Sequence, residues 1–216
     1  GEVQEEIKDY CTQHQLLLWE TLPAKASSPA TGFTGLEALA GRSGQVWLCD
    51  LRALPQPDAI QRANEVFTDR PSTAVVVPLQ VQTNGTISAA YSLLDQYGTL
   101  HHWPVGAPAN HPHHGYRRVI DAASSTLVVI KKQCLEHLDT EALGKYHTPL
   151  YQLTDLIWQL KTQQWDTVYE ASLGYQVDQP LLSLDTSQYE EDRQRFLTRW
   201  QTQLVTQTRL LVSHYA

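Results

Sequence analysis

Residues 45–71 constrain the fold more than any other segment, because a predicted strand is followed there by a predicted helix. The strand covers 45–50, and its residues 46–49 are apolar. Pro57 stands where the first residue of a helix is expected, and apolar residues then recur at helical spacing until 69–71. Because a second strand is expected directly afterwards, the chain alternates strand and helix, which is typical of an α/β fold.

The rest of the chain continues this alternation. Further helices are expected at 2–13, 36–40, 132–138, 149–161 and 188–215, and further strands at 15–19, 73–77, 124–130 and 165–170. The pairs Asn84-Gly85 and Tyr97-Gly98 are turn signals that predict two short hairpin arms, and a loop rich in His and Pro is expected at 101–115. Residues 1–216 are therefore predicted to form a single α/β domain, a sandwich of helix, mixed sheet and helix.

Charge and hydropathy exclude some classes of partner. The chain has 16 basic and 23 acidic residues, which gives a net charge of -7. This balance argues against a general nucleic-acid or anionic-membrane binder, although it leaves room for a local cationic pocket that binds one phosphate group. No apolar run approaches the roughly 20 residues of a membrane-spanning helix.

Cysteine and methionine usage bears on the origin of the chain. Cys11, Cys49 and Cys134 are odd in number and far apart, so they predict neither a disulfide framework nor a structural zinc site. A reducing, cytoplasmic location is the simplest expectation. Methionine is absent, including at position 1, so the chain is expected to be an excised part of a longer polypeptide.

The order of several short motifs resembles family 2 glycosyltransferases of the GT-A fold. The segments that carry the resemblance are Gly32-Phe33-Thr34-Gly35, 46–50 with 55–60, 78–87, 155–161 with 165–169, and 196–200. The resemblance spans nearly the whole chain. It implies a GT-A-like fold and transfer from a nucleotide sugar, and it places the start of this chain after the first β-α-β elements, which build the nucleotide pocket in the family.

The resemblance assigns Asp50 and Arg52 to the donor diphosphate. The family strand ends in Asp-x-Asp, which holds a divalent metal such as Mn or Mg, because hard cations prefer carboxylate oxygens. Here Asp50 takes the first place and Arg52 the second, and a guanidinium repels a metal ion but pairs well with phosphate oxygens. The alternatives are that Asp50 caps a turn or helix and that Arg52 is a solvated loop residue.

The resemblance also implies a catalytic base just before the family's Asp-Leu helix motif, which matches this chain from Asp155 onward. The family uses an acid there to take the proton from the acceptor hydroxyl. Counting back from Asp155 places Gln152 and Leu153 at the acidic positions, and neither accepts that proton. Asp155 is the only candidate base left, and its simpler interpretation is a helix-borne acid with a local partner.

The His-rich and Pro-rich loop corresponds to the acceptor side of the family's site. Trp103, His111, His113 and His114 are the candidate contacts to an acceptor or partner, and Trp103 is suited to stack on a sugar ring. Zinc or nickel binding by these histidines is an alternative, but the loop has no nearby Cys or acid, so a mobile polar loop is preferred and no metal site is predicted.

Two functions follow from these observations. The preferred one is a degenerate transferase-like domain that binds a glycan or a protein without chemistry and needs no cofactor. The alternative is an active transferase that moves a hexose from a nucleotide sugar to a hydroxyl acceptor, with Mn or Mg and with the missing elements supplied elsewhere. Losses at the metal, base and nucleotide positions together favour the first function.

Overall fold

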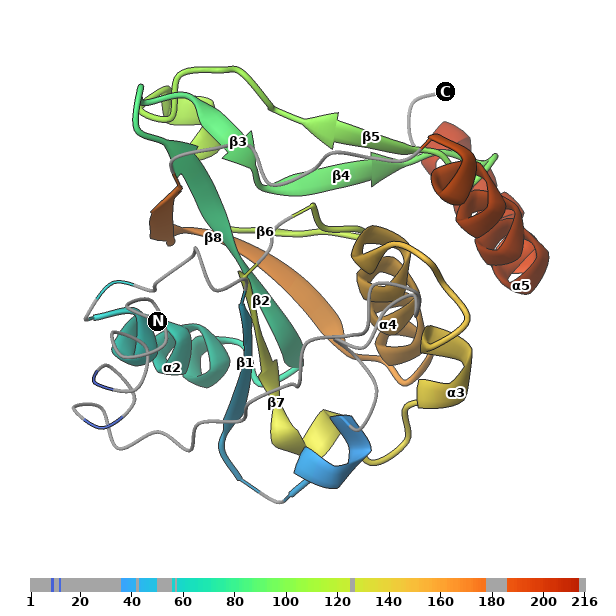
Figure 1. The fold of residues 1–216 in the computed structure, drawn as a ribbon, viewed down its shortest axis with the longest axis horizontal. Coiled ribbons are helices and arrows are strands. Elements are labelled where there is room, and N and C mark those ends of the chain that lie inside the picture. Colours follow the sequence, from blue (N-terminus) through green and yellow to red (C-terminus); the bar gives the residue numbers. More distant parts are fainter. Residues whose placement is uncertain are drawn as a thin grey trace.

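The computed structural model describes residues 9, 12, 36–41, 43–49, 56, 58–124, 127–177 and 186–213 (Figure 1). They form a mixed α/β fold, which confirms the fold class predicted from the sequence. The predicted strand at 15–19 lies outside the described residues. Of the predicted helix at 2–13, only residues 9 and 12 are described, and both are helical.

The central sheet has six strands, and three of them run in the same direction. Its order is β1 (Gln45–Cys49), β7 (Leu127–Lys131), β2 (Thr73–Gln82), β8 (Asp166–Val177) and β6 (Arg118–Val119), with β3 (Ile87–Ala89) paired to β2. β2 and β8 are parallel, whereas β7 is antiparallel to both β1 and β2. β1, β2 and β8 therefore point the same way, with the antiparallel β7 between β1 and β2.

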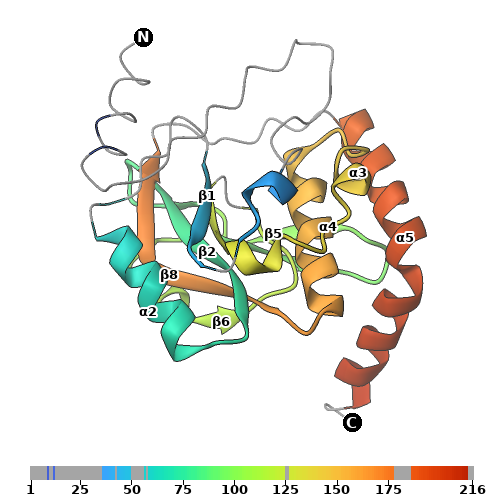
Figure 2. The ribbon, with the colours of Figure 1, turned by 90° about the horizontal axis from the view of Figure 1, so that it is seen from below.

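Helices cover both faces of this sheet (Figures 1 and 2). α2 (Ala59–Asp69) packs on one face, where its Ala63 and Val66 contact Val76 and Val168. α3 (Thr140–Leu143) and α4 (Pro149–Thr162) lie on the other face, and α5 (Thr186–Ser213) packs on the outer side of α4. Because α4 is enclosed between the sheet and α5, all its residues from Leu150 to Leu160 are buried.

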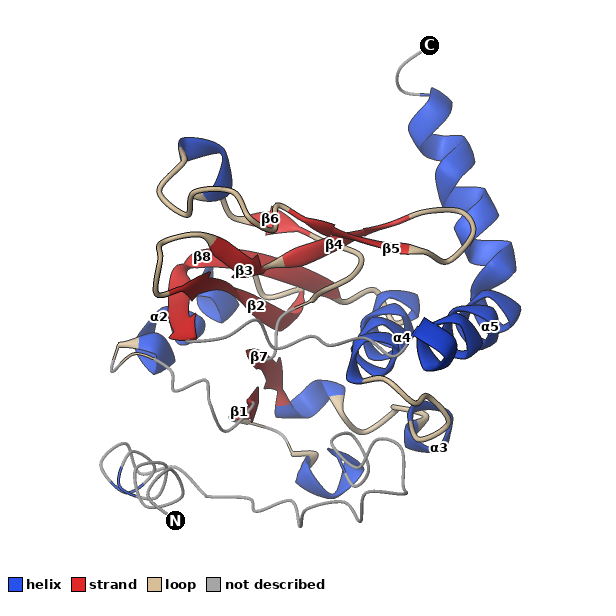
Figure 3. Ribbon diagram, turned by 45° about the horizontal axis from the view of Figure 1, so that its top comes forward, coloured by secondary structure: helices blue, strands red, loops and turns tan. Residues whose placement is uncertain are grey.

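A separate hairpin of two strands extends from one end of the sheet (Figure 3). It consists of β4 (Tyr91–Leu94) and β5 (Leu100–Trp103), which pair antiparallel. The predicted loop at 101–115 is therefore wrong for its first three residues, which belong to β5. A short turn of 3-10 helix, η2 (Pro112–His114), follows later in that loop.

The remaining differences from the predicted elements lie mostly at element ends. Leu36–Leu39 (η1) and Lys132–Cys134 (η3) form single turns of 3-10 helix instead of α-helices. β8 continues to Val177, seven residues beyond the predicted end, because it bends and pairs with β2 a second time after a register shift at Pro78. Proline has no N–H to donate to the ladder, which accounts for the irregularity at that point.

Candidate functional site

The donor side of the predicted site is described only in part. Asp50 and Arg52 lie outside the described residues, so their assignment to a diphosphate stays a prediction. The described strand ends at Cys49, and β1 stands at one edge of the sheet. Its carboxyl end points the same way as those of β2 and β8, and ligands of open α/β sheets commonly bind beyond such ends.

Asp155 lies in the middle of α4 and faces α5. Its side chain has no exposed surface. Oδ1 accepts hydrogen bonds of 3.3 Å from Trp200 Nε1 and from Gln159 Nε2, and Oδ2 lies 3.6 Å from Arg199 Nη1. Because Trp200 and Arg199 belong to α5, this acid joins the two helices.

The electrostatics of Asp155 fit this enclosed position. Burial raises the pKa of its carboxyl group, although the Tyr146 hydroxyl and the positive charge of Arg199 act in the opposite direction. A general base must come within hydrogen-bond reach of the proton that it removes. Since Asp155 has no exposed surface and its partners belong to the protein, its position supports the interpretation as an acid with local partners and gives no support to a role as base.

The two positions at which the family carries its acids are also inside the protein. Gln152 and Leu153 are both buried in α4. Gln152 Nε2 donates to the backbone oxygen of Tyr146 at 3.3 Å, and Leu153 belongs to the main hydrophobic core. Asp155 is the only acidic residue of α4, so this helix presents no carboxylate to solvent.

Trp103 lies at the end of β5 and is exposed over 54% of its surface. Its cross-strand partner is Tyr91, which is buried and packs edge-on against Tyr169 with ring centres 5.2 Å apart. Leu93, two residues from Tyr91 and on the same face of the hairpin, is exposed as well. The hairpin therefore presents an indole and an aliphatic side chain to solvent on one face.

The three candidate histidines lie close together around η2. His111 precedes the turn, and its Nδ1 accepts a hydrogen bond from the backbone N–H of His113 at 3.3 Å. The ring of His111 stacks on that of His113 at 5.0 Å between centres and lies 5.5 Å from that of His114. Burial lowers the pKa of His114, and positive charge on His111, Arg118 and His113 lowers it further.

Contacts with α5 hold the hairpin in place. Arg193 Nη1 donates to the backbone oxygen of Tyr97 at 2.6 Å, and the Tyr189 hydroxyl accepts from the Leu100 N–H at 3.1 Å. Gly98 has a φ of 74°, and a Cβ atom there would lie 3.6 Å from the backbone oxygen of Arg193. Glycine thus allows both the turn and the close approach of α5. The pair Tyr97-Gly98 predicts this turn, but no local pattern predicts its contact with α5.

Glu170 is a buried carboxylate that the sequence analysis did not single out. Its Oε2 lies 2.5 Å from Arg117 Nε, and its Oε1 accepts from the Ser172 N–H at 3.0 Å. Burial opposes ionisation, but Arg117 and Ser172 together lower the pKa of Glu170. Arg117 also pairs with Asp69 at the end of α2, so this network links α2 to β8.

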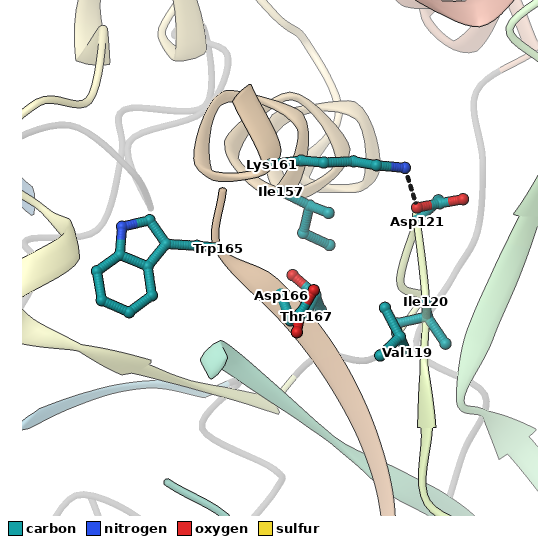
Figure 4. Close-up of a pocket in the computed structure, with 8 residues that line it drawn as sticks. All are labelled: Val119, Ile120, Asp121, Ile157, Lys161, Trp165, Asp166 and Thr167. Atoms are coloured by element: carbon teal, nitrogen blue, oxygen red, sulfur yellow. Dashed lines mark hydrogen bonds and ion pairs between the residues drawn. The ribbon is translucent and has the colours of Figure 1, made fainter. Parts of the chain in front are cut away.

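A small pocket lies between β6, β8 and the end of α4 (Figure 4). Its walls include Asp121, Lys161 and Trp165, and Lys161 Nζ lies 2.5 Å from Asp121 Oδ1. The volume of this cavity is about 20 Å³. Clefts that enclose small-molecule ligands usually have about 300 to 1,000 Å³, so this pocket is too small for a nucleotide sugar.

The described side chains form no metal site. Within residues 36–204, gaps excepted, no group of three His, Cys, Asp or Glu side chains is arranged to hold a metal ion. The histidines around η2 are stacked or tilted against each other and do not converge on one point. Their arrangement gives no support to the zinc or nickel alternative.

Three further observations bear on the class of protein. No described helix is long and apolar enough to cross a membrane. Comparison of the chain with protein-family models gave no match, and comparison with curated proteins gave none either. The resemblance to family 2 glycosyltransferases accordingly rests on the order of short motifs in the sequence.

Proposed function

We propose that this chain is part of a GT-A-like domain, related to family 2 glycosyltransferases, that has lost sugar transfer and binds a glycan or a protein. The binding region is the acceptor-side surface, a name used here for Trp103, His111, His113 and His114. The mixed sheet supports the relationship, because the strand expected to border the donor cleft, β1, points the same way as β2 and β8. A cytoplasmic location stays a prediction.

The burial of Asp155 carries the inactive part of this proposal. It is the last acid near the expected position of the base, and it is bound by Trp200, Gln159 and Arg199 inside the protein. Arg52 occupies the place of the metal-binding acid in the sequence. Sugar transfer in the family requires a base and a metal ligand. The residues at the matching positions of this chain supply neither of them.

The exposure of the acceptor-side surface supports the binding part. Trp103, His111 and His113 are exposed, and His114 is partly so. The hairpin and η2 lie on the same side of the molecule (Figure 1, top). Aromatic side chains with polar tips are frequent anchors at binding surfaces, because they bury a large area at a small cost in conformational entropy. The surface is held by packed elements, so its geometry is set before a partner arrives.

Calorimetric titration with uridine diphosphate and guanosine diphosphate, with and without manganese, tests the loss of the donor site. We expect no binding tighter than millimolar, because the matching metal position carries a cation. Inorganic phosphate at the same concentrations serves as the control for unspecific binding of anions. Micromolar affinity that depends on manganese, roughly 4 kcal/mol stronger, would instead establish the alternative of an active nucleotide-sugar transferase.

A further inference from the structure

The turn Pro112–His114 lies next to a cation that no acid neutralises within the described part of the chain. Arg118, in β6, donates from Nη1 to the Tyr91 hydroxyl at 2.9 Å and from Nη2 to the backbone oxygen of His113 at 2.8 Å. Both partners are uncharged, and no described carboxylate lies within ion-pair distance of Arg118. Its neighbour Arg117 differs, since it pairs with Glu170 and Asp69.

The position of Arg118 is fixed. Its guanidinium carbon lies 5.1 Å from the ring centre of Tyr91 and 6.0 Å from that of Tyr169. The Tyr169 hydroxyl donates to the backbone oxygen of His114 at 2.8 Å, so the same tyrosine contacts both the cation and the turn. An uncompensated cation in a fixed place beside three imidazoles is an arrangement that favours an anion.

We propose that His111, His113, His114 and Arg118 bind an acidic group of a glycan, a carboxylate or a sulfate, and that binding strengthens as the pH falls. This inference rests on the proposed function, because it names the ligand of the acceptor-side surface. Tyr116, which is 64% exposed, follows the turn in sequence and offers an aromatic ring for the sugar, as Trp103 does on the hairpin. With a net charge of -7, the chain as a whole does not attract anions, so affinity must arise locally.

Protonation of the histidines supplies the pH dependence. An imidazolium donates two N–H groups and carries a positive charge, whereas a neutral imidazole donates one. The groups that contact the turn from other elements are Arg118 in β6 and Tyr169 in β8, and Tyr91 in β4 contacts Arg118. Glu170, next to Tyr169 in β8, is held by Arg117. A bound anion offsets the mutual repulsion of these cations and favours the protonated rings.

Titration of the full chain with sodium sulfate, followed by NMR of the histidine ring C–H signals, tests this site. Sodium chloride keeps the ionic strength constant. We expect saturable shifts for His111, His113 and His114, with an affinity at least about fivefold higher at pH 5.5 than at pH 7.5. His137, which lies beyond η3, is the internal control and should not shift. Shifts of all histidines that rise linearly with sulfate would overturn the proposal.

Two variants separate the histidines from the arginine. The triple variant His111→Asn, His113→Asn and His114→Gln should lose the pH dependence, and Asn at 111 keeps an acceptor for the 113 N–H. Arg118→Gln should weaken binding at both pH values. Because Arg118 packs against two aromatic rings, circular dichroism checks that the Arg118→Gln variant folds. If this variant does not fold, the triple variant alone decides the outcome. His137→Asn is the matched control, and an unchanged pH dependence in the triple variant would refute the site.

Competition experiments identify the ligand class. Glucuronate should displace sulfate, whereas glucose at the same concentration should not, because only the former carries a carboxylate. Displacement by neither sugar would refute the assignment to a glycan. If a neutral glycan or a protein binds the surface through Trp103 while sulfate leaves the three histidines unchanged, the anion site is refuted and the proposed function stands. If no glycan or protein binds the surface either, both are refuted.

Discussion

The interface between α4 and α5 and the acceptor-side surface both concentrate polar side chains, yet they use them in opposite ways. At the α4/α5 interface, Asp155 and Asp192 have no exposed surface, and each is bound by groups of the other helix or its N-terminus. At the acceptor-side surface, Trp103, His111 and His113 are exposed and His114 is partly exposed, and the partners of Arg118 among the described residues are uncharged. The buried acids therefore link elements of the fold, whereas exposed aromatic and imidazole side chains lie on the hairpin and around η2.

Asp192 shows how fully the interface uses its acids. Its Oδ1 accepts from the His147 N–H at 2.8 Å, and its Oδ2 accepts from the Thr148 N–H at 2.7 Å and from the Thr148 hydroxyl at 2.8 Å. These groups stand directly before Pro149, the first residue of α4. An acid from α5 thus supplies the negative charge that the N-terminus of α4 favours.

The largest effect is expected for Asp192→Ala. The change leaves two backbone N–H groups and a buried hydroxyl without their acceptor, which should lower the free energy of unfolding by about 3 kcal/mol or more. Urea denaturation measures it. Glu191→Ala is the matched control, since the side chain of Glu191 is 65% exposed and pairs with His147 at the surface. Similar losses in both variants would show that the interface does not depend on the buried acid.

Asp155→Asn should show a smaller effect that depends on pH. Because the pKa of Asp155 is raised in the folded state, the acid contributes most below its unfolded value of 3.8, and this contribution is lost as the pH rises through the folded pKa. Asn does not titrate, so the variant should gain stability relative to the original chain between pH 4 and pH 8. The net difference should stay within about 1 to 2 kcal/mol.

Urea denaturation across this pH range checks the expected slope. Glu141→Gln serves as the control, because the side chain of Glu141 is 85% exposed. A stability difference between Asp155→Asn and the original chain that does not change with pH would contradict the assignment of a raised pKa.

Tyr189→Phe tests the link between the interface and the surface. It removes the acceptor of the Leu100 N–H and should cost about 1 kcal/mol. The amide of Leu100 should also exchange faster with solvent, because α5 then holds the hairpin less firmly. Tyr116→Phe, at an exposed ring, should change neither quantity. An unchanged exchange rate at Leu100 would mean that Arg193 and Gly98 suffice to fix the hairpin.

Features that depend on local sequence could be predicted. The periodicity of residues 149–161 and 188–213 gave the helices α4 and α5, and Asn84-Gly85 and Tyr97-Gly98 gave both hairpin turns, because helix spacing and turn chemistry are set by neighbours in the chain. Trp103 was predicted as a contact residue in a loop, whereas it lies at the end of β5 and is exposed there.

Features that depend on distant partners could not be predicted. Asp155 and Trp200 are 45 positions apart, and Asp192 and Thr148 are 44 apart, so nothing in the local sequence marks these acids as structural. The resemblance left Asp155 as the only candidate base, although its simpler interpretation was a helix-borne acid with a local partner, and the sequence did not identify that partner. The sequence also could not show that Arg118 lacks an acidic partner among the described residues. Only the fold shows that the nearby carboxylates of Asp69 and Glu170 pair with its neighbour Arg117.

Trp103→Ala should have the smallest effect on stability and a large effect on binding. Because the indole is more than half exposed, its loss should change the free energy of unfolding by less than about 0.5 kcal/mol. At the centre of a binding surface, removal of an aromatic anchor commonly costs about 2 kcal/mol of affinity, which is roughly thirtyfold.

Tyr97→Ala, at the exposed turn of the same hairpin, is the control and should retain the affinity of the original chain. Binding is measured by immobilising the chain on a biosensor and titrating oligosaccharides over it. If the tryptophan variant binds oligosaccharides as the original chain does but unfolds more easily, Trp103 stabilises the fold and does not bind a ligand. That result would contradict the contrast drawn between the α4/α5 interface and the acceptor-side surface.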